Sequence, residues 1–170
     1  MENKHDLRIK AKNIRKNLNM EKISQQILSA ILNLDIFNLS EHIMLFYPLQ
    51  YEVNLLNLLN VENKKFYLPR INGEDLECCP YKKHDLLKLS FFKTKEPISK
   101  SINPQILDLI FVPALMVDTF NYRLGYGKGF YDRFLQKTNA YTIVPIAKEL
   151  LVENLPIDSY DKPVNLVITQ

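Results

Sequence analysis

Glycine is scarce in this chain of 170 residues, which contains only four. Gly125, Gly127 and Gly129 stand at alternate positions in the stretch YRLGYGKGFYDRFL, and Gly73 stands alone. Glycine is the residue that permits positive φ angles and close approach of the backbone to a ligand. A chain so poor in glycine that places three close together therefore marks this stretch as the first candidate for a functional loop.

Cysteine is also scarce. Cys78 and Cys79 are the two cysteines, and they are neighbours in the sequence. Adjacent cysteines rarely form a disulfide with each other because the geometry is poor, and two cysteines do not provide the spacing of a zinc site. We therefore expect a protein of a reducing compartment.

Long apolar segments and a strong excess of charge are absent from the sequence. The opening MENKHDLRIK lacks the apolar centre of a signal peptide, and no apolar run reaches the roughly 18 residues of a membrane span. The formal net charge is +3, from 22 Lys and Arg against 19 Asp and Glu, which is too small to indicate nucleic-acid binding. We expect a cytoplasmic protein, a monomer by its size, that binds neither membranes nor nucleic acid.

The pattern of apolar residues predicts an α/β fold in one domain spanning 1–170. Helical periodicity over 3–34, with a break near Asn19–Met20, predicts an N-terminal helical segment of two helices. Short apolar runs predict strands at 42–48, 65–70, 76–81, 107–115, 141–147 and 165–169, and helices are expected at 54–60 and 130–138. The chain from 82 to 101 is expected to be rich in loops. This alternation predicts a central, largely parallel open sheet with helices on both faces.

The glycine stretch follows the strand predicted at 107–115, and ligands of open α/β sheets bind beyond the carboxyl ends of strands. Alternating glycines allow several backbone N–H groups to face one point, which suits a phosphate, and a helix is expected to start there. Arg123 and Lys128 add positive charge, and Asp132 could hold Mg²⁺. The spacing matches neither the dinucleotide fingerprint nor the P-loop, so a tight loop that needs glycine for steric reasons alone remains the alternative.

The segment FVPALMVDTFNYRLGYGKGFYDRFL resembles the signature of the 5-formyltetrahydrofolate cyclo-ligase family, also called methenyltetrahydrofolate synthetases. That signature is a strand ending in Val-Pro, an apolar-Asp pair and R-L-G-x-G-x-G-[YF]-Y-D-R. Further landmarks of the family follow in order: K-x-x-L-R from Lys4 to Arg8, Tyr47 with Glu52 and Val53, Leu68 to Arg70, Glu96–Pro97, and Leu155–Pro156 with Asp161 before the last strand. The resemblance covers nearly the whole chain.

Three positions depart from the family pattern. Asn121 stands where the family usually has glycine, Leu150 where it often has Gln, and Tyr160 where it often has His. Asparagine tolerates the left-handed conformation better than most residues, so we expect the turn at Asn121 to survive. These departures concern peripheral contacts more than the central loop.

The resemblance implies an enzyme that uses ATP and Mg²⁺ to convert the small molecule 5-formyltetrahydrofolate into 5,10-methenyltetrahydrofolate, with release of ADP and phosphate. The formyl oxygen is a poor leaving group, and phosphoryl transfer to it makes ring closure by the folate nitrogen possible. Such a transfer depends mainly on positioning and on electrostatic stabilisation of negative charge.

The resemblance also implies the roles of individual residues. The expected catalytic residues are Arg123 and Lys128. The expected ATP-binding residues are Lys4, Arg8, Arg123, Leu124, Gly125, Tyr126, Gly127, Lys128, Gly129, Phe130 and Tyr131. The expected substrate-binding residues are Tyr47, Glu52, Tyr126, Gly127, Lys128, Gly129 and Phe130. The expected metal ligands are Asp132 and Asp161.

Without the resemblance, plainer interpretations stay open. Lys4 and Arg8 share one helix face by their spacing, and such a pair is often only a solvated surface. Glu52 could merely begin a helix. A non-catalytic sensor of a phosphorylated metabolite could use the same glycine loop, although Asp132 and Asp161 favour an enzyme because phosphate sensing alone needs no metal.

Overall fold

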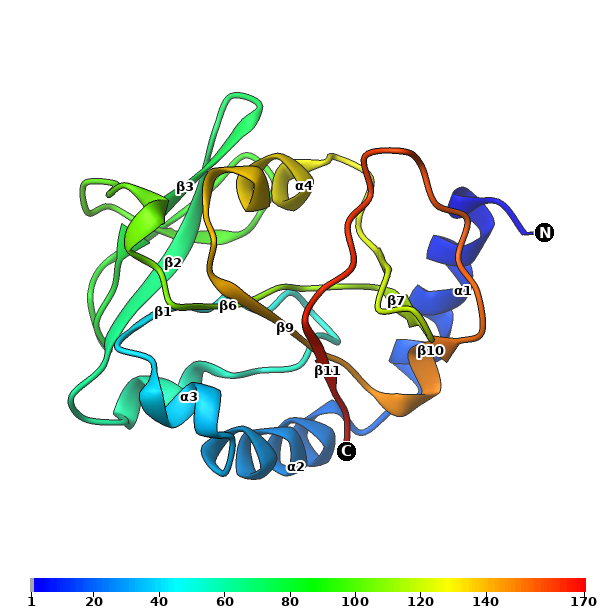
Figure 1. Cartoon of the computed structure of the whole chain (residues 1–170), viewed down its shortest axis with the longest axis horizontal. Coiled ribbons are helices and arrows are strands. Elements are labelled where there is room, and N and C mark those ends of the chain that lie inside the picture. Colours follow the sequence, from blue (N-terminus) through cyan, green and yellow to red (C-terminus); the bar gives the residue numbers. More distant parts are fainter. Residues whose placement is uncertain (1) are drawn as a thin grey trace.

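A six-stranded sheet forms the centre of the computed structural model, which describes residues 2–170 (Figure 1). Its strands lie in the order β11 (Leu166–Ile168), β9 (Tyr141–Pro145), β6 (Leu109–Phe111), β1 (His42–Met44), β2 (Lys65–Asn72) and β3 (Asp75–Pro80). Every neighbouring pair is parallel except β2 and β3, which form an antiparallel hairpin. The predicted largely parallel sheet is confirmed, including the strand predicted at 76–81, and Gly73, with a φ of +63°, lies in the turn between β2 and β3.

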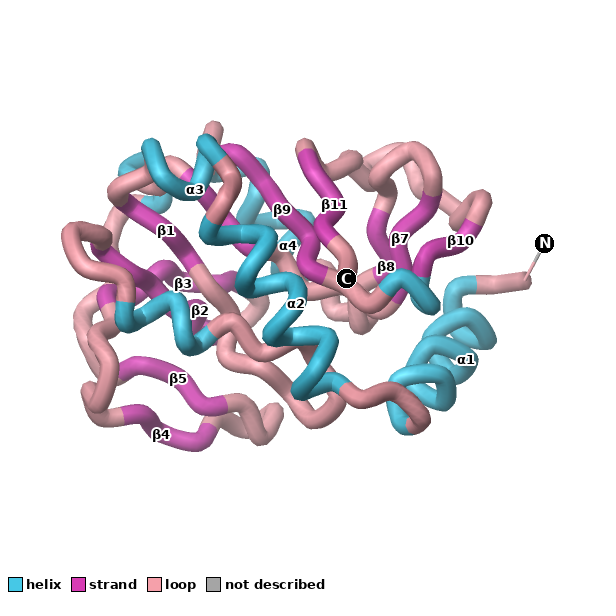
Figure 2. Tube along the Cα trace, turned by 90° about the horizontal axis from the view of Figure 1, so that it is seen from below, coloured by secondary structure: helices cyan, strands magenta, loops and turns pink. Residues whose placement is uncertain are grey.

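Helices cover both faces of this sheet, as the sequence predicted. On one face lie α2 (Met20–Leu32) and α3 (Asp35–Leu39), and α4 (Phe130–Phe134) lies on the other (Figures 1 and 2). The first helix, α1 (Lys4–Lys16), packs at one end of the molecule. The predicted break between the first two helices is confirmed.

Asparagine side chains set the starts of these two helices. Asn3 accepts a hydrogen bond from the Asp6 amide at the start of α1, and Asn19 accepts one from the Lys22 amide at the start of α2. Each satisfies a backbone N–H that the helix itself leaves unpaired. The capping asparagines therefore place the break between α1 and α2 where the apolar periodicity also places it.

Two smaller sheets were not predicted. One contains β10 (Leu151–Val152), β7 (Met116–Asp118) and β8 (Arg123–Leu124) in that order. The other is a hairpin of β4 (Leu87–Leu89) and β5 (Lys95–Pro97), inside the segment expected to be mostly loop. The single strand predicted over 107–115 is wrong in its extent: β6 ends at Phe111, and the chain enters a different sheet after Pro113, which has no N–H to donate to a ladder.

Two predicted helices are shorter than expected. The segment 54–60 forms a 3₁₀ helix over Leu56–Asn60. The Asn54 side chain accepts a hydrogen bond from the Leu56 amide, and such a bond competes with the backbone hydrogen bonds of an α-helix. The helix predicted over 130–138 stops at Phe134 and tightens into a 3₁₀ turn over Leu135–Lys137. The glycine stretch is therefore followed by little more than one helical turn.

One cluster of buried apolar side chains joins the helices to the sheet. Leu7 and Ala11 of α1, and Ile27 of α2, belong to the same buried cluster as strand residues such as Ile43 and Ile110. The parallel strands β1 and β6 are buried on both faces, which explains why they read as continuous apolar runs in the sequence. Among residues 2–170, no helix has both the length and the apolar character that a membrane crossing needs.

Candidate functional site

A cavity of about 640 Å³ opens beyond the carboxyl ends of β1 and β6, where Tyr47 and Pro113 line it. The chain leaves β1 toward β2 on one side and returns to β6 on the other, so the cavity lies at the switch point where α/β sheets bind ligands. Its volume is in the range of small-molecule sites, about 300–1,000 Å³. Every residue that the sequence assigned to ATP, folate or metal lines this one cavity.

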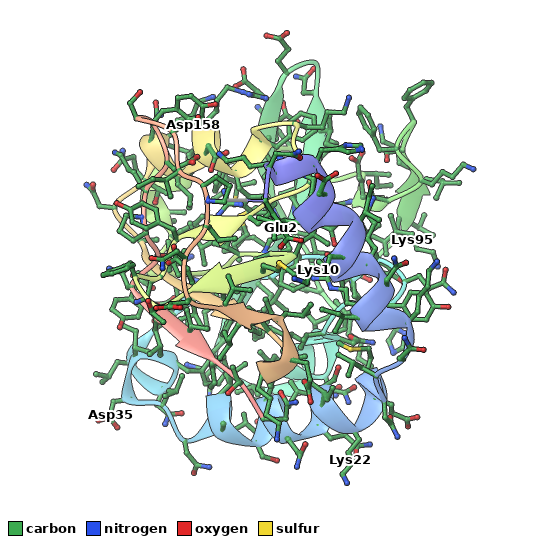
Figure 3. All side chains as sticks on the ribbon, turned by 90° about the vertical axis from the view of Figure 1, so that its right-hand side faces the viewer. Glu2, Lys10, Lys22, Asp35, Lys95 and Asp158 are labelled. Carbon is green, nitrogen blue, oxygen red and sulfur yellow. The ribbon has the colours of Figure 1, made fainter. Side chains whose placement is uncertain are left out.

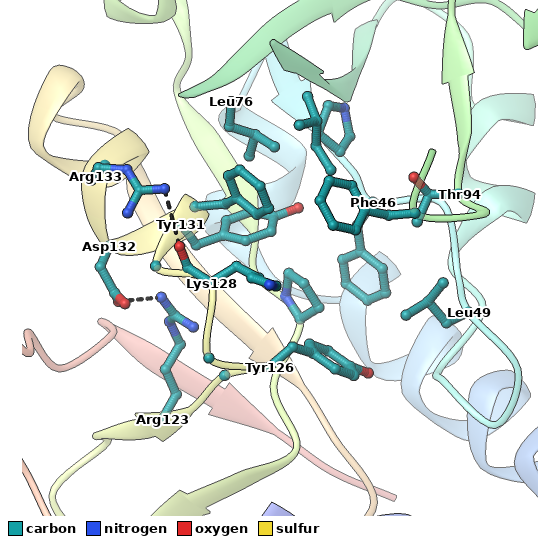
Figure 4. A pocket seen from close by; sticks show the side chains of 18 of the residues that line it. Phe46, Leu49, Leu76, Thr94, Arg123, Tyr126, Lys128, Tyr131, Asp132 and Arg133 are labelled. Atoms are coloured by element: carbon teal, nitrogen blue, oxygen red, sulfur yellow. Dashed lines mark hydrogen bonds and ion pairs between the residues drawn. The ribbon is translucent and has the colours of Figure 1, made fainter. Parts of the chain in front are cut away.

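The glycine stretch forms one wall of the cavity (Figure 4). Gly127 has a φ of +98° and Gly129 a φ of +70°, which side chains rarely tolerate. A Cβ atom at Gly127 would also lie 3.1 Å from Cζ of Arg8. The positive φ angles therefore favour glycine at positions 127 and 129, and a side chain at position 127 would press against the guanidinium of Arg8, which lines the cavity.

The turn that leads into the stretch tolerates the departure at position 121. Asn121 has a φ of +65°, the left-handed conformation that was expected to survive there. The buried Asp118 carboxylate accepts the amides of Phe120 and Tyr122, both at 2.9 Å, and closes the turn between β7 and β8. The other departures lie apart from it, since Leu150 is buried in the core and Tyr160 is exposed.

Positive and negative side chains alternate at one end of the cavity. Arg123 Nη2 donates to Asp132 Oδ1 at 2.5 Å (Figure 4). Arg8 Nε donates to the carbonyl oxygen of Gly125 at 2.9 Å, which ties α1 to the glycine stretch. Lys128 extends into the cavity, with its Nζ 6.0 Å from the centre of the Phe92 ring. We call this end, which also includes the first turn of α1, the charged end.

Lys4 bridges two aspartates at the rim of the charged end. Its Nζ donates to Asp158 Oδ2 at 2.6 Å and to Asp161 Oδ2 at 2.8 Å. Burial opposes the charged form of Lys4, but the hydrogen bonds to the two carboxylates outweigh it and raise the pKa of the ammonium. The hydrogen bonds from Lys4 and Tyr160 lower the pKa of Asp158. Asp158 was not predicted as a site residue.

The two predicted metal ligands thus each face a predicted ATP-binding cation, Asp132 facing Arg123 and Asp161 facing Lys4. No group of three or more His, Cys, Asp or Glu side chains among residues 2–170 is arranged to hold a metal ion. Asp132 and Asp161 offer carboxylate oxygens, the hard ligands that Mg²⁺ prefers.

The opposite end of the cavity contains a buried polar network. The Glu52 carboxylate accepts the Leu49 amide at 2.7 Å and the hydroxyl of Tyr126. Nη1 of Arg15 donates to the same hydroxyl at 2.7 Å. We call this end, built around Glu52, the buried end. Burial first, and then the Glu52 charge, raise the pKa of Tyr126, so its phenol stays a donor.

Arg15 was missed in the sequence, although a signal for it existed. It follows Arg8 by seven residues, which is two helical turns and the same face of α1. The outer face of the helix carries ordinary surface charge, such as Lys10 Nζ 3.2 Å from Glu2 Oε2 (Figure 3). The periodicity that identified the apolar residues of α1 did not distinguish the cations that face the protein interior from those that face solvent.

The β4–β5 hairpin contributes a further wall that the sequence did not assign. Phe92 packs edge-on against Phe130 of the glycine stretch, with ring centres 6.0 Å apart. Glu96 lines the cavity and is buried, and it accepts the Ile71 amide at 3.0 Å. The Glu96–Pro97 pair was noticed only as a landmark, and the weak hydropathy pattern of this segment contained no signal for a cavity wall.

The comparisons with known proteins agree with each other. The model of the 5-formyltetrahydrofolate cyclo-ligase family matches residues 1–170. A 5-formyltetrahydrofolate cyclo-ligase of Haemophilus influenzae is 29% identical over 182 aligned positions, covering 94% of each chain. One of Escherichia coli K12 is 30% identical over 122 positions, covering 62% of this chain and 63% of the relative.

Solved structures of similar proteins share the fold. The NMR structure of Aquifex aeolicus 5,10-methenyltetrahydrofolate synthetase superposes with a TM-score of 0.85 and 30% identity, covering 96% of this chain and 88% of that one. A 5,10-methenyltetrahydrofolate synthetase of Mycoplasma pneumoniae superposes with a TM-score of 0.80 over 99% of both chains, at 20% identity. The second likeness bears on the fold alone.

Proposed function

The chain belongs to the 5-formyltetrahydrofolate cyclo-ligase family, and from this premise we propose that it converts 5-formyltetrahydrofolate to 5,10-methenyltetrahydrofolate with ATP and Mg²⁺. One observation carries the proposal: the residues that the family motif assigned to nucleotide, folate and metal come from distant parts of the chain and line a single cavity. Phosphoryl transfer needs such convergence because its catalysis is mostly positioning and charge stabilisation.

The charged end suits the phosphates of ATP. Arg8 and Arg123 can each donate two parallel hydrogen bonds to a phosphate, and Lys128 adds a mobile point charge. The space where Gly127 has no side chain lets the backbone and Arg8 approach the same anion. Bound there, ATP supplies the phosphoryl group that makes the formyl oxygen a good leaving group.

Asp132 and Asp161 would hold Mg²⁺, which neutralises negative charge on the transferred phosphoryl group. The cations that now face these carboxylates, Arg123 and Lys4, would then be available to the phosphates. The ion pairs of the charged end thus keep both sets of groups in place and close together.

The buried end suits the folate. Glu52 can accept hydrogen bonds from the N–H groups of the pterin, and Phe46, Tyr47 and Leu49 provide apolar walls beside it. Tyr126 belongs to both ends because it lies in the glycine stretch and hydrogen-bonds to Glu52. One loop would therefore bring the phosphoryl donor and the formyl oxygen together.

A direct assay tests the proposal. Purified protein is mixed with 5-formyltetrahydrofolate, ATP and Mg²⁺, and the absorbance of methenyltetrahydrofolate is followed together with ADP. We expect both products in equal amounts, and neither when one of the three components is omitted. Folded protein that is stabilised by ATP against heat but forms no product would reject the enzyme and favour the sensor.

We further propose that 1–170 acts as one domain and as a monomer, and that it works in the cytoplasm. The single cluster of buried side chains supports the first point. Light scattering at several protein concentrations tests the second, since a dimer would be seen directly.

A further inference from the structure

We propose that Arg15 of α1 is a positioning residue that holds the folate-recognising groups of the buried end, acting through Tyr126 and Glu52. The inference rests on the proposed function, because it concerns how that reaction's substrate is gripped. It assigns to α1 a second role, distinct from the contacts of Lys4 and Arg8 at the charged end.

The contacts of Arg15 join three separate parts of the chain. Nη1 donates to the Tyr126 hydroxyl at 2.7 Å and lies 3.9 Å from Oε1 of Glu52. Nη2 donates to the carbonyl oxygen of Ala114, just after β6. The Tyr126 hydroxyl in turn donates to Glu52. Because Arg15 occupies a lone pair of that hydroxyl, the hydroxyl proton is directed at the carboxylate.

Apolar side chains could fill this part of the core, so stability alone does not account for the buried end. The Arg15 side chain is 7% exposed and that of Glu52 4%, and the Nε of Arg15 is buried without an acceptor among residues 2–170. An unmet buried donor costs free energy, and apolar side chains of similar volume often serve a core as well as a buried ion pair. Ala11, one turn before Arg15, is itself fully buried, so an apolar residue at position 15 would continue the packed face.

The position of Arg15 along α1 separates it from the nucleotide contacts. It lies seven residues beyond Arg8, about 10 Å further along the helix axis at 1.5 Å per residue. Arg8 contacts the backbone of Gly125, whereas Arg15 contacts the side chain of the next residue, Tyr126. The helix thus fixes the glycine stretch at two points, one facing each end of the cavity.

The orientation of Glu52 follows from this network. One carboxylate oxygen accepts from Tyr126 and the other from the Leu49 amide. A carboxylate has about four acceptor positions, so those that remain are held in one direction. A substrate that donates to a carboxylate held in this way loses less entropy of ordering, which is the benefit of preorganisation.

The test separates binding of the two substrates. In Arg15→Met and Tyr126→Phe, the KM for 5-formyltetrahydrofolate is expected to rise about tenfold to a hundredfold, the range for a lost hydrogen bond to a charged group. The KM for ATP should change less than about twofold, because Arg15 lies about 10 Å beyond Arg8 along the helix, and Tyr126→Phe keeps the ring and the backbone of the glycine stretch and removes only the hydroxyl that faces Glu52. Arg15→Lys keeps the charge but cannot reach both partners, so an intermediate rise is expected. Lys16→Met, an exposed neighbour, is the matched control.

The combined variant Arg15→Met with Tyr126→Phe should be little worse than either single variant, because both break one chain of contacts. Equal rises in both KM values, or fully additive effects, would overturn the inference and leave Arg15 a structural residue. If Arg15→Met does not fold, Arg15→Lys and Tyr126→Phe decide by the same split between the two substrates. Failure of the wild-type protein to form product would instead reject the proposed function, and the inference with it.

Discussion

The rim of the charged end and the buried end hold their charges in opposite ways, although inside the charged end the Arg123 side chain is only 6% exposed. At the rim of the charged end, the Lys4 side chain is 27% exposed and its partner Asp158 is 48% exposed, so water and salt screen their attraction. At the buried end, Arg15 and Glu52 are almost fully enclosed, and their attraction is screened far less. Exposed pairs of this kind are easily exchanged, whereas a buried network is costly to break.

This contrast matches the two ligands proposed for the cavity. A polyphosphate with its metal carries charge of its own and can take over the partners of Lys4 at the rim. A pterin presents neutral N–H groups and needs an acceptor that is already held in place. We therefore expect substitutions at the charged end to change catalysis and metal use, and substitutions at the buried end to change folate binding.

Arg123→Ala would test the charged end most severely. An arginine that stabilises a transferring phosphoryl group is commonly worth about 10³-fold or more in rate, so we expect a loss of turnover of about that size. Lys128→Ala should lose turnover too, by a smaller factor, because its flexible side chain is less tightly positioned. Single-turnover formation of methenyltetrahydrofolate measures both, and Lys148→Ala, exposed and remote from the cavity, is the control. A folded Arg123→Ala protein with normal turnover would contradict the proposed role.

Glu52→Gln would test the buried end. The amide keeps the size of the side chain but replaces an acceptor oxygen by a donor, so the KM for 5-formyltetrahydrofolate should rise about tenfold to a hundredfold. The KM for ATP should stay nearly unchanged. Glu62→Gln, at an exposed position outside the cavity, should behave as wild type. If ATP binding weakened as much as folate binding, the division of the cavity into two ends would be wrong.

Asp161→Asn would sharpen the assignment of the metal. Removing one of two proposed carboxylate ligands should raise the Mg²⁺ concentration needed for half-maximal turnover by about tenfold, since an amide is a weaker ligand for a hard cation. The maximal rate at saturating Mg²⁺ should fall much less than in Arg123→Ala. Asp35→Asn, on α3 and outside the cavity, is the matched control. An unchanged Mg²⁺ requirement would remove Asp161 from the metal site.

Lys4→Met should give the smallest effect of these substitutions, and we expect it in thermal stability, because the ion pairs of Lys4 are partly exposed. The lowered pKa of Asp158 means that this stabilisation is present above the carboxylate's ordinary pKa and is lost as the pH falls through the folded value. The raised pKa of Lys4 means that it is also present below the ammonium's ordinary pKa and is lost as the pH rises through the folded value.

The Tm of Lys4→Met should therefore lie about 1–2 °C below wild type near pH 7, with the difference vanishing at both extremes of pH and at about 1 M salt. Thermal unfolding followed by circular dichroism measures this, with Lys12→Met, exposed on α1, as the control. A large difference in Tm that persists at high salt would mean that the ion pairs of Lys4 are not easily exchanged for contacts with a ligand.

Much of the fold could be predicted because its signals are local. The strands β1 and β9 are continuous apolar runs, and the break before Met20 coincides with a capping asparagine. The short strands β7, β8 and β10 were missed because two or three residues are too few for a periodic pattern, and their pairing depends on segments far apart in the chain.

The candidate site divides in the same way. The glycine stretch was found because alternating glycines between Arg123 and Asp132 form a local pattern. Glu96 and Phe92 were missed as site residues because nothing near them in the sequence distinguishes a cavity wall from a surface, and Arg15 was missed because it acts behind the cavity lining, through Tyr126 and Glu52. Their role follows from which elements pack beside the stretch, as the contact of Phe92 with Phe130 illustrates.

By itself, the sequence determined the chemical groups of the glycine stretch and the left-handed turn at Asn121, because backbone freedom and side-chain charge belong to single residues. Only the tertiary structure decided which cation faces which carboxylate: Lys4 meets Asp161 across 157 positions of the chain, and Arg15 reaches Tyr126 across 111. The physical reason is that burial of Leu7 and Ala11 holds α1 against the core. The hydrophobic effect that drives this burial is not directional, so the tertiary packing, and not the local sequence, decides where the charged side chains of α1 point.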